Sequence, residues 1–391
     1  MNCGFDIMVS LHLHKRVILS IFGTIILLMF LTMIFQNDKA QNPDQSSAQI
    51  KNSQNNPRFN NLLNSELYSL SKKWFKENCL SKYEENNMKF EFIDDYIDSF
   101  KSSRNKNCIT VFTIFDSMFE LDISYGEIRI DEKFLDKVKI WLNNNPDYVK
   151  QAYKQKIIKI YNKFHNDEMI YNPLRGKRPQ AKQIVSEKNH SLKIIEESKS
   201  SCDFCEQNYK INTANEIFDR LETPLSYSAA NTFKYDKWHS LIVSRNHDPL
   251  NLKEEEIIDM YSLSWEWFKK VSSIDPSAKF PELIWDAMPK SGASQIHTHL
   301  QVSMDDKNYY GIMRRWLEAS ERYFGAFKRD FLDDFILIHK ALGLAYELNN
   351  CYVIFSLIPL KDNEVMIIGD NDPKSYLTIS KLTYQVIRSN L

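Results

Sequence analysis

Two histidines and a glutamine alternate along one short stretch of the chain, at a spacing that could do chemistry. Residues 291–303 read Ser-Gly-Ala-Ser-Gln-Ile-His-Thr-His-Leu-Gln-Val-Ser. Side chains of a strand alternate between its two faces, so a strand here would point His297, His299 and Gln301 the same way. An imidazole nitrogen can attack an electrophile or bind a metal, and an amide can hold anionic oxygens. The pattern therefore indicates a functional site rather than ordinary buried histidines.

Small residues precede these side chains and could bring backbone N–H groups close to an anion. Gly292 has no side chain to block such an approach, and Ser294 adds a hydroxyl beside the amides. We therefore expect Gly292 and Ser294 to bind phosphate groups of a substrate.

A basic loop at 171–179 is a second candidate for phosphate binding. Four of its residues are turn formers and three are cationic. Planar guanidinium groups suit bidentate contact with phosphate, which makes Arg175 and Arg178 candidate ligands. The alternative is a solvated basic loop that binds nothing.

Six cysteines are spread over the chain, and two of them form a Cys-x-x-Cys. That pair, Cys202 and Cys205, fits half of a zinc site, a redox pair or a disulfide. In an oxidising compartment Cys79 could pair with Cys108, and two free buried thiols are the alternative.

The elements that would position these side chains follow from the apolar patterns. Residues 238–243 are expected to form a strand, followed by a turn that contains His247. A helix should then run over 252–271, because its first turn is acidic and its apolar residues have helical spacing. Residues 283–285 are expected to form a strand that leads toward the two histidines.

The order Gly-x-Ser-x-x-His-x-His-x-Gln resembles the histidine-triad superfamily, in the branch of galactose-1-phosphate uridylyltransferase and diadenosine tetraphosphate phosphorylase. The resemblance covers residue 171 to the C-terminus and is strongest over 202–302. It implies an α+β fold, a histidine-triad-like antiparallel sheet with flanking helices, in two related halves. The second half would consist of a helix at 331–348, strands at 351–357 and 365–368, and a helix at 374–388. This half has no second His-x-His.

The same resemblance implies a set of metal ligands. In zinc-bearing members the ligands are two cysteines, a histidine in the turn, and the first histidine of His-x-His. They map here onto Cys202, Cys205, His247 and His297, which would hold a structural zinc ion. A disulfide between Cys202 and Cys205 is the alternative.

The resemblance also implies that His299 is a nucleophile that forms a covalent nucleotidyl-histidine. Gln301 stands where hydrolases of the superfamily carry a third histidine, whereas the transferring enzymes carry glutamine. The implied function is a nucleotidyltransferase or phosphorylase that acts on a nucleotide sugar or dinucleoside polyphosphate. A nucleotide hydrolase and a catalytically inactive, zinc-stabilised nucleotide-binding domain are the alternatives. One position departs from the pattern, since Asp286 stands where the family usually has asparagine.

An uncharged apolar run near the N-terminus is typical of a membrane segment. Nineteen residues, 17–35, follow Lys15 and Arg16 and, as a helix, would nearly cross a hydrocarbon core of about 30 Å. Because the positive residues precede the run, we expect a type II signal-anchor with 1–16 in the cytosol. The rest would lie in the lumen of the endoplasmic reticulum or Golgi, or outside the cell. A cleaved signal peptide is the alternative.

The remaining chain divides by composition into three parts. Residues 36–65 are polar and are expected to be a flexible stem, 66–170 a mixed α/β extension, and 171–391 the catalytic domain. Within the extension, 67–83 and 90–100 have helical spacing. Residues 108–115 are β-branched and aromatic, which predicts a strand, and Asn145-Pro146 predicts a helix that starts there and runs to about Phe164.

Charge restricts the partners. Lys and Arg total 50 against 51 Asp and Glu, for a formal charge of −1. Such a balance excludes the basic footprint of a nucleic-acid binder, so no nucleic-acid partner is expected. The expected partners are a nucleotide or nucleotide-sugar substrate and a membrane, and the sequence does not indicate an oligomeric state.

Overall fold

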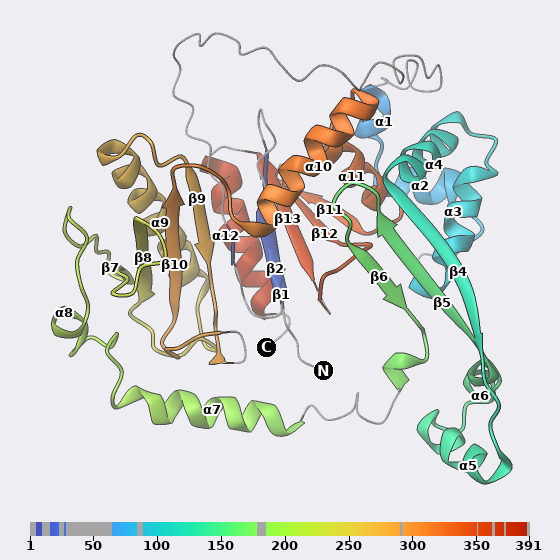
Figure 1. Ribbon diagram of the computed structural model, residues 1–391, viewed down its shortest axis with the longest axis horizontal. Helices are drawn as coiled ribbons and strands as arrows, with labels where there is room; N and C mark the ends of the chain where they lie inside the picture. Colours follow the sequence, from blue (N-terminus) through green and yellow to red (C-terminus); the bar gives the residue numbers. More distant parts are fainter. Residues whose placement is uncertain are drawn as a thin grey trace.

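The structure is a computed structural model that describes residues 5–9, 16–22, 27–28, 65–83, 89–177, 185–289, 292–349, 351–361, 364–370 and 373–388. These residues form an α+β protein with three mainly antiparallel sheets and helices packed against them (Figure 1). The expected α+β class with antiparallel sheets and flanking helices is thereby confirmed.

A four-stranded antiparallel sheet carries most of the predicted site. Its strands, in spatial order, are β7 (Ser226–Ala230), β8 (Trp238–Ser244), β10 (His299–Asp305) and β9 (Phe280–Ile284). The predicted strand at 295–302 starts later, at His299, which lies opposite Val243 in the ladder. Leu300 and Val302 are fully buried, as the alternation predicts, whereas Ile296 is only partly buried.

The helix expected at 252–271 is α9 (Glu254–Ile274), and it covers this sheet. Three glutamates occupy its first turn, where the helix dipole favours negative charge. At its start the Lys253 backbone N–H donates to Glu256 Oε2 over 2.7 Å. The predicted apolar stripe is buried at Ile257, Phe268 and Val271.

A six-stranded sheet lies next to the first one (Figure 1). Its spatial order is β11 (Ala345–Leu348), β12 (Cys351–Phe355), β13 (Val365–Asp370), β2 (Arg16–Phe22), β1 (Phe5–Val9) and β3 (Leu27–Leu28). β3 contacts β9, so the two sheets meet edge to edge. The closing helix α12 (Pro373–Arg388) packs on this sheet and on α9, with the Tyr261 hydroxyl 3.2 Å from Thr383 Oγ1.

The N-terminal apolar run differs from the expected membrane helix. In its described part, residues 17–22 belong to strand β2, which pairs antiparallel with β13, and Leu27–Leu28 form β3. None of the described helices is long and apolar enough to cross a bilayer. Valine and isoleucine suit a buried strand as well as a membrane helix, and β13 offers an edge to pair with. Residues 23–26 and 29–35, and the predicted stem at 36–65 except Ser65, lie outside the described residues.

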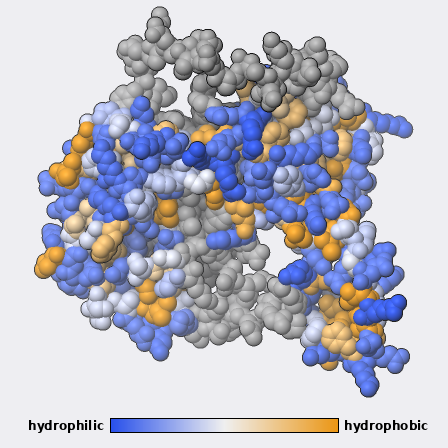
Figure 2. Space-filling model, viewed as in Figure 1, coloured by the Kyte–Doolittle hydropathy of each residue, from blue (hydrophilic) through white to orange (hydrophobic). Residues whose placement is uncertain are grey.

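The extension before residue 171 forms a separate layer around the antiparallel sheet β4 (Phe119–Glu127), β5 (Lys154–Asn162) and β6 (Glu168–Tyr171). The helices of this layer are α1 (Ser65–Ser69), α2 (Lys72–Cys79), α3 (Ile93–Lys101), α4 (Lys106–Met118), α5 (Glu132–Trp141) and α6 (Pro146–Tyr153). In Figures 1 and 2, α5 and α6 project at the lower right, where apolar residues reach the surface. Ile140 is the most exposed of these, at 67%.

Two predicted elements in this layer are wrong. Residues 108–115 belong to helix α4, which Asn105 caps through its side chain and which buries Val111 and Ile114. Tertiary packing against α3 and α11 (Phe331–Ala341) therefore overrides the strand propensity of β-branched residues. The helix that begins at Pro146 ends at Tyr153 rather than near Phe164, because the chain then pairs with β4 along its whole length.

A disulfide links two helices of this layer, and a buried ion pair with its neighbours joins the layer to α11. Cys79 of α2 and Cys108 of α4 form the disulfide that the sequence allowed. Arg329 contacts both carboxylate oxygens of the fully buried Asp334, and that carboxylate also accepts hydrogen bonds from Tyr68 and Tyr323. Tyr68 lies on α1 and Tyr323 on α10 (Gly311–Phe327), so the network joins the start of this layer to α10 and α11.

Candidate metal centre and adjoining cavity

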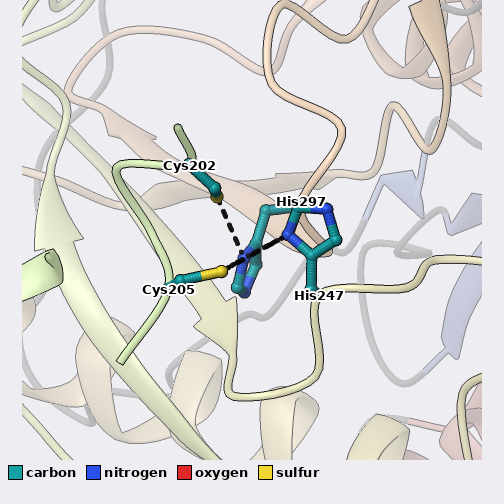
Figure 3. Close-up of side chains that lie close together, drawn as sticks. All are labelled: Cys202, Cys205, His247 and His297. Carbon is teal, nitrogen blue, oxygen red and sulfur yellow. Dashed lines mark hydrogen bonds between the residues drawn. The ribbon is translucent and has the colours of Figure 1, made fainter. Parts of the chain in front are cut away.

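Four buried side chains from three distant segments meet at one point (Figure 3). They are the four predicted ligands, Cys202, Cys205, His247 and His297, and their ligand atoms all lie within 4.8 Å of one another. His297 comes from the bend before β10 and His247 from the turn after β8. The structure thus brings together residues up to 95 positions apart.

Local hydrogen bonds shape the cysteine segment, which lies between α7 (Val185–Lys199) and α8 (Tyr209–Asn212). The Asn208 side chain donates to the Cys202 carbonyl over 2.8 Å, and the Asn208 and Tyr209 amides donate to the Cys205 carbonyl. The Tyr227 hydroxyl donates to the carbonyl of Phe204 over 2.7 Å. The loop is therefore tied to β7, with both sulfurs turned inward.

The turn that carries His247 is held just as firmly. Arg245 donates to Glu206 and Glu222, and its guanidinium lies over the rings of Tyr209 and Tyr227. These contacts fasten the start of the turn to the cysteine segment and to β7.

Hydrogen bonds to backbone carbonyls set the tautomers of both histidines in the cluster. His297 Nε2 lies 2.6 Å from the Ser244 carbonyl, and His247 Nε2 lies 3.1 Å from the Ile195 carbonyl. A carbonyl only accepts, so each Nε2 carries the proton and each Nδ1 keeps its lone pair. Burial also lowers the pKa of His297 to about 4, which keeps the ring neutral at pH 7.

The spacing of the four atoms fits a tetrahedral ion. The two Nδ1 atoms are 3.2 Å apart, and the sulfur–nitrogen distances are 3.3, 3.5 and 3.6 Å. Ligands about 2.3 Å (sulfur) and about 2.0 Å (nitrogen) from a tetrahedral centre would be separated by about 3.3 to 3.8 Å. Two facing lone pairs with no proton between them repel, which a cation relieves. The group can therefore hold a metal ion.

The alternative of a disulfide between the two cysteines does not describe this geometry. Cys202 and Cys205 are both free thiols in the structure, and each sulfur contacts a histidine nitrogen. A metal centre uses all four side chains at once, whereas a disulfide would leave the two imidazoles facing each other.

A cavity of about 270 Å³ opens beside this cluster. Gly292, Ser294, His299 and Gln301, all predicted from the sequence, contribute to its wall. His299 Nδ1 lies 2.7 Å from the carbonyl of His297, so Nδ1 carries the proton and Nε2 keeps a free lone pair. Burial lowers the pKa of His299 below its usual value, and the ring is neutral at pH 7.

A chain of hydrogen bonds orients the amide of Gln301. The Tyr235 amide donates to His239 Nδ1, so His239 Nε2 carries a proton and donates to Gln301 Oε1 over 3.1 Å. The Gln301 amide nitrogen then donates to Asp286 Oδ2 over 3.3 Å. Asp286 therefore contacts a wall residue of the cavity.

The loop before the histidines requires glycine. Gly292 has φ +103°, a backbone conformation that side chains disfavour, and both Gly292 and Ser294 are exposed. Lys290 and Ser291 lie outside the described residues.

The described part of the basic loop, 171–177, does not line this cavity. Arg175 is exposed in a short 3-10 turn, Arg175–Lys177, that follows β6, and it does not line the cavity wall. Arg178 lies outside the described residues. Their phosphate-binding role stays a prediction.

His239, which contacts the wall residue Gln301, is a polar residue that the sequence patterns do not single out. It is 1% exposed and lies on β8, two residues before Leu241, the position paired with Gln301. Alternation from Leu241 places His239 on the cavity face, but its contact with Gln301 depends on the strand register, which the sequence does not display.

Comparisons with known proteins add no relative: no protein-family model matches the chain, and no curated protein matches it. The resemblance drawn from the motif therefore stays a prediction, and the geometry of the site has to support any function by itself.

Proposed function

We propose that the chain is a nucleotidyltransferase or phosphorylase with a histidine-triad-like fold of two related halves. Its substrate would be a nucleotide sugar or a dinucleoside polyphosphate, and its intermediate a covalent nucleotidyl-histidine. One observation carries the proposal. His299 Nδ1 donates its proton to the His297 carbonyl over 2.7 Å, which leaves the Nε2 lone pair free on a ring that lines the cavity.

The reaction would proceed in two displacements at one phosphorus atom. First, the His299 Nε2 lone pair attacks the α-phosphorus, the N–P bond forms, and the bond to the leaving oxygen breaks with its electron pair going to that oxygen. Second, an oxygen of phosphate or a sugar phosphate attacks the same phosphorus. The N–P bond then breaks, and its electron pair returns to Nε2.

Three neighbours of His299 have roles in this scheme. The Gly292 and Ser294 segment offers backbone amides and a hydroxyl to the phosphoryl oxygens. Gln301, oriented by His239, can hydrogen-bond to these oxygens but cannot pass on a proton as an imidazolium does. This difference supports transfer to a phosphorylated acceptor rather than hydrolysis.

We propose that the ion of the Cys202, Cys205, His247 and His297 group is zinc with a structural role. Two thiolates and two imidazoles in tetrahedral arrangement suit zinc, and four protein ligands leave no open position for a substrate. The group would tie the start of β10 to the cysteine segment and so position His299 two residues further on.

A trapping experiment tests the nucleophile. The full chain is incubated with labelled nucleotide sugars and diadenosine polyphosphates, denatured, and analysed for an acid-labile, base-stable nucleotide on the protein. His299→Ala should abolish the adduct and keep the metal, because the ligand role belongs to His297. His297→Ala should lose both the metal and much of the stability.

Two results would contradict the proposal. Full turnover by His299→Ala excludes covalent catalysis by this strand. Nucleotide binding by the wild type without any adduct or turnover would make the chain a binding domain instead.

We also propose that the domain works in the lumen of the secretory pathway or outside the cell. The Cys79–Cys108 disulfide supports this, because disulfides form and persist in oxidising compartments. Protease protection of the domain in sealed microsomes is the test, and digestion without detergent would contradict it.

A further inference from the structure

Asp286 stands beside the cavity with its carboxyl group against the loop that we expect to hold phosphate. A Cβ atom added to Gly292 would lie 3.8 Å from Asp286 Cγ and 3.9 Å from each carboxyl oxygen. Gly292 and Gln301 both line the cavity, and Gln301 donates to Asp286 Oδ2. The carboxyl group is therefore placed directly behind two residues of the cavity wall.

Few charges act on this carboxyl group. Among the described residues, Lys361 is the cation that acts electrostatically on Asp286. On β10 the neighbouring group is the neutral amide of Gln301. Burial raises the pKa of the Tyr235 hydroxyl, and the charge of Asp286 adds to this effect. His239, one hydrogen bond further, is a neutral ring because burial lowers its pKa. Lys290 lies outside the described residues.

The charge state of Asp286 changes within the physiological range. Burial raises the pKa of Asp286 to about 6, against the opposing effects of the Gln301 hydrogen bond and Lys361. The group is thus mainly a carboxylate at pH 7.5 and mainly a neutral acid at pH 5.

A negative charge at this wall distinguishes two kinds of phosphate. A terminal phosphate loses its second proton with a pKa of about 6, so it carries almost two negative charges at pH 7.5. A phosphate bridged at two oxygens carries one charge, so a nearby carboxylate repels it about half as strongly.

We propose that Asp286 is a specificity-determining residue of the nucleotide site, which admits bridged phosphates and discriminates against terminal ones. This inference rests on the proposed function and specifies which phosphate lies beside His299. It predicts that the free nucleoside monophosphate competes poorly with the intact substrate at neutral pH, so that accumulated monophosphate does not occupy the site.

Calorimetric binding to the metal-loaded full chain tests this. The probes are adenosine and uridine 5′-monophosphates and their 5′-phosphate methyl esters, which differ by one negative charge. At pH 7.5, Asp286→Asn should raise affinity for the better-binding monophosphate about tenfold and for its ester less than about threefold. At pH 5.0 the gain for the monophosphate should fall below about twofold.

A matched control is Asp306→Asn, which removes an exposed carboxylate outside the cavity and should leave all affinities unchanged. Equal monophosphate affinity of wild type and Asp286→Asn at pH 7.5, with both proteins binding, overturns the role of Asp286 alone. A wild-type protein that binds none of the probes overturns the proposed nucleotide site together with this inference.

Discussion

At the scale of single residues, a second pair of polar side chains lies on the cavity face of the sheet beyond Gln301. Glu282 on β9 lies opposite Ser303 on β10, and the Tyr235 hydroxyl donates to Ser303 Oγ over 3.3 Å. Glu282 is 4% exposed, and burial raises its pKa to about 8, with the Ser303 hydrogen bond opposing. The group is therefore a protonated acid at pH 7 within the folded protein.

This assignment predicts how stability depends on pH. The unfolded chain releases the Glu282 proton near its usual value of 4.5, whereas the folded chain keeps it to about 8. Between these values the unfolded state binds fewer protons, so the free energy of unfolding falls as pH rises, by about 5 kcal/mol in total. This contribution of Glu282 to the free energy of unfolding is fully present below pH 4.5 and lost above about pH 8.

Glu282→Gln removes this group and should give a flatter stability profile. Denaturant unfolding of both proteins from pH 5 to pH 8 is the measurement, and the difference between them cancels other titrating groups such as Asp286. A wild-type profile that stays parallel to that of Glu282→Gln would show that the Glu282 carboxyl is not held protonated.

At the scale of elements, the disulfide between α2 and α4 closes a loop with a sequence separation of 29. Without the disulfide the unfolded chain gains conformational entropy, which lowers the free energy of unfolding by about 3 to 4 kcal/mol. The double variant Cys79→Ser, Cys108→Ser should be destabilised by this amount, as measured by denaturant unfolding.

A control separates the disulfide from the other cysteines. Cys351 is a buried cysteine that is not part of a disulfide, so Cys351→Ala should still lose stability when reductant is added, as the wild type does. The double variant should not respond to reductant. If reductant has no effect on the wild type, the two cysteines are thiols in solution.

At the scale of the whole molecule, the two sheets depend on the N-terminal strands for their shared edge. β2 pairs with β13 from Arg16 to Ile21, and β3 contacts β9. Deleting residues 1–28 should expose the edge of β13, lower the melting temperature and promote aggregation, because unpaired strand edges template association. Thermal unfolding and light scattering of the shortened and full chains measure both effects.

The opposite outcome is equally informative. A shortened chain that is monomeric and melts at the same temperature would show that β13 does not need β2. The apolar run at 17–35 would then be available for the membrane anchor that its composition indicates.

Patterns that repeat along the chain were sufficient for several features. The helical spacing at 252–271 and the acidic first turn predict α9, and the strand expected at 238–243 is β8. The motif at 291–303 singled out His299 and Gln301, which do line one cavity. These features depend on residues close in sequence, whose periodicity reveals the buried face directly.

Only the tertiary structure decided what depends on distant partners. Residues 108–115, with strand propensity, form a helix, and the predicted helix from Pro146 gives way to a strand after Tyr153. In both cases packing and pairing with remote segments outweigh small differences in propensity. The proton of His299 Nδ1 is held by a neighbouring carbonyl, and the orientation of Gln301 is set by His239 across the strand register. Hydrogen bonds and burial of this kind exist only once the chain has folded, so the chemical state of the site could not be read from residue types alone.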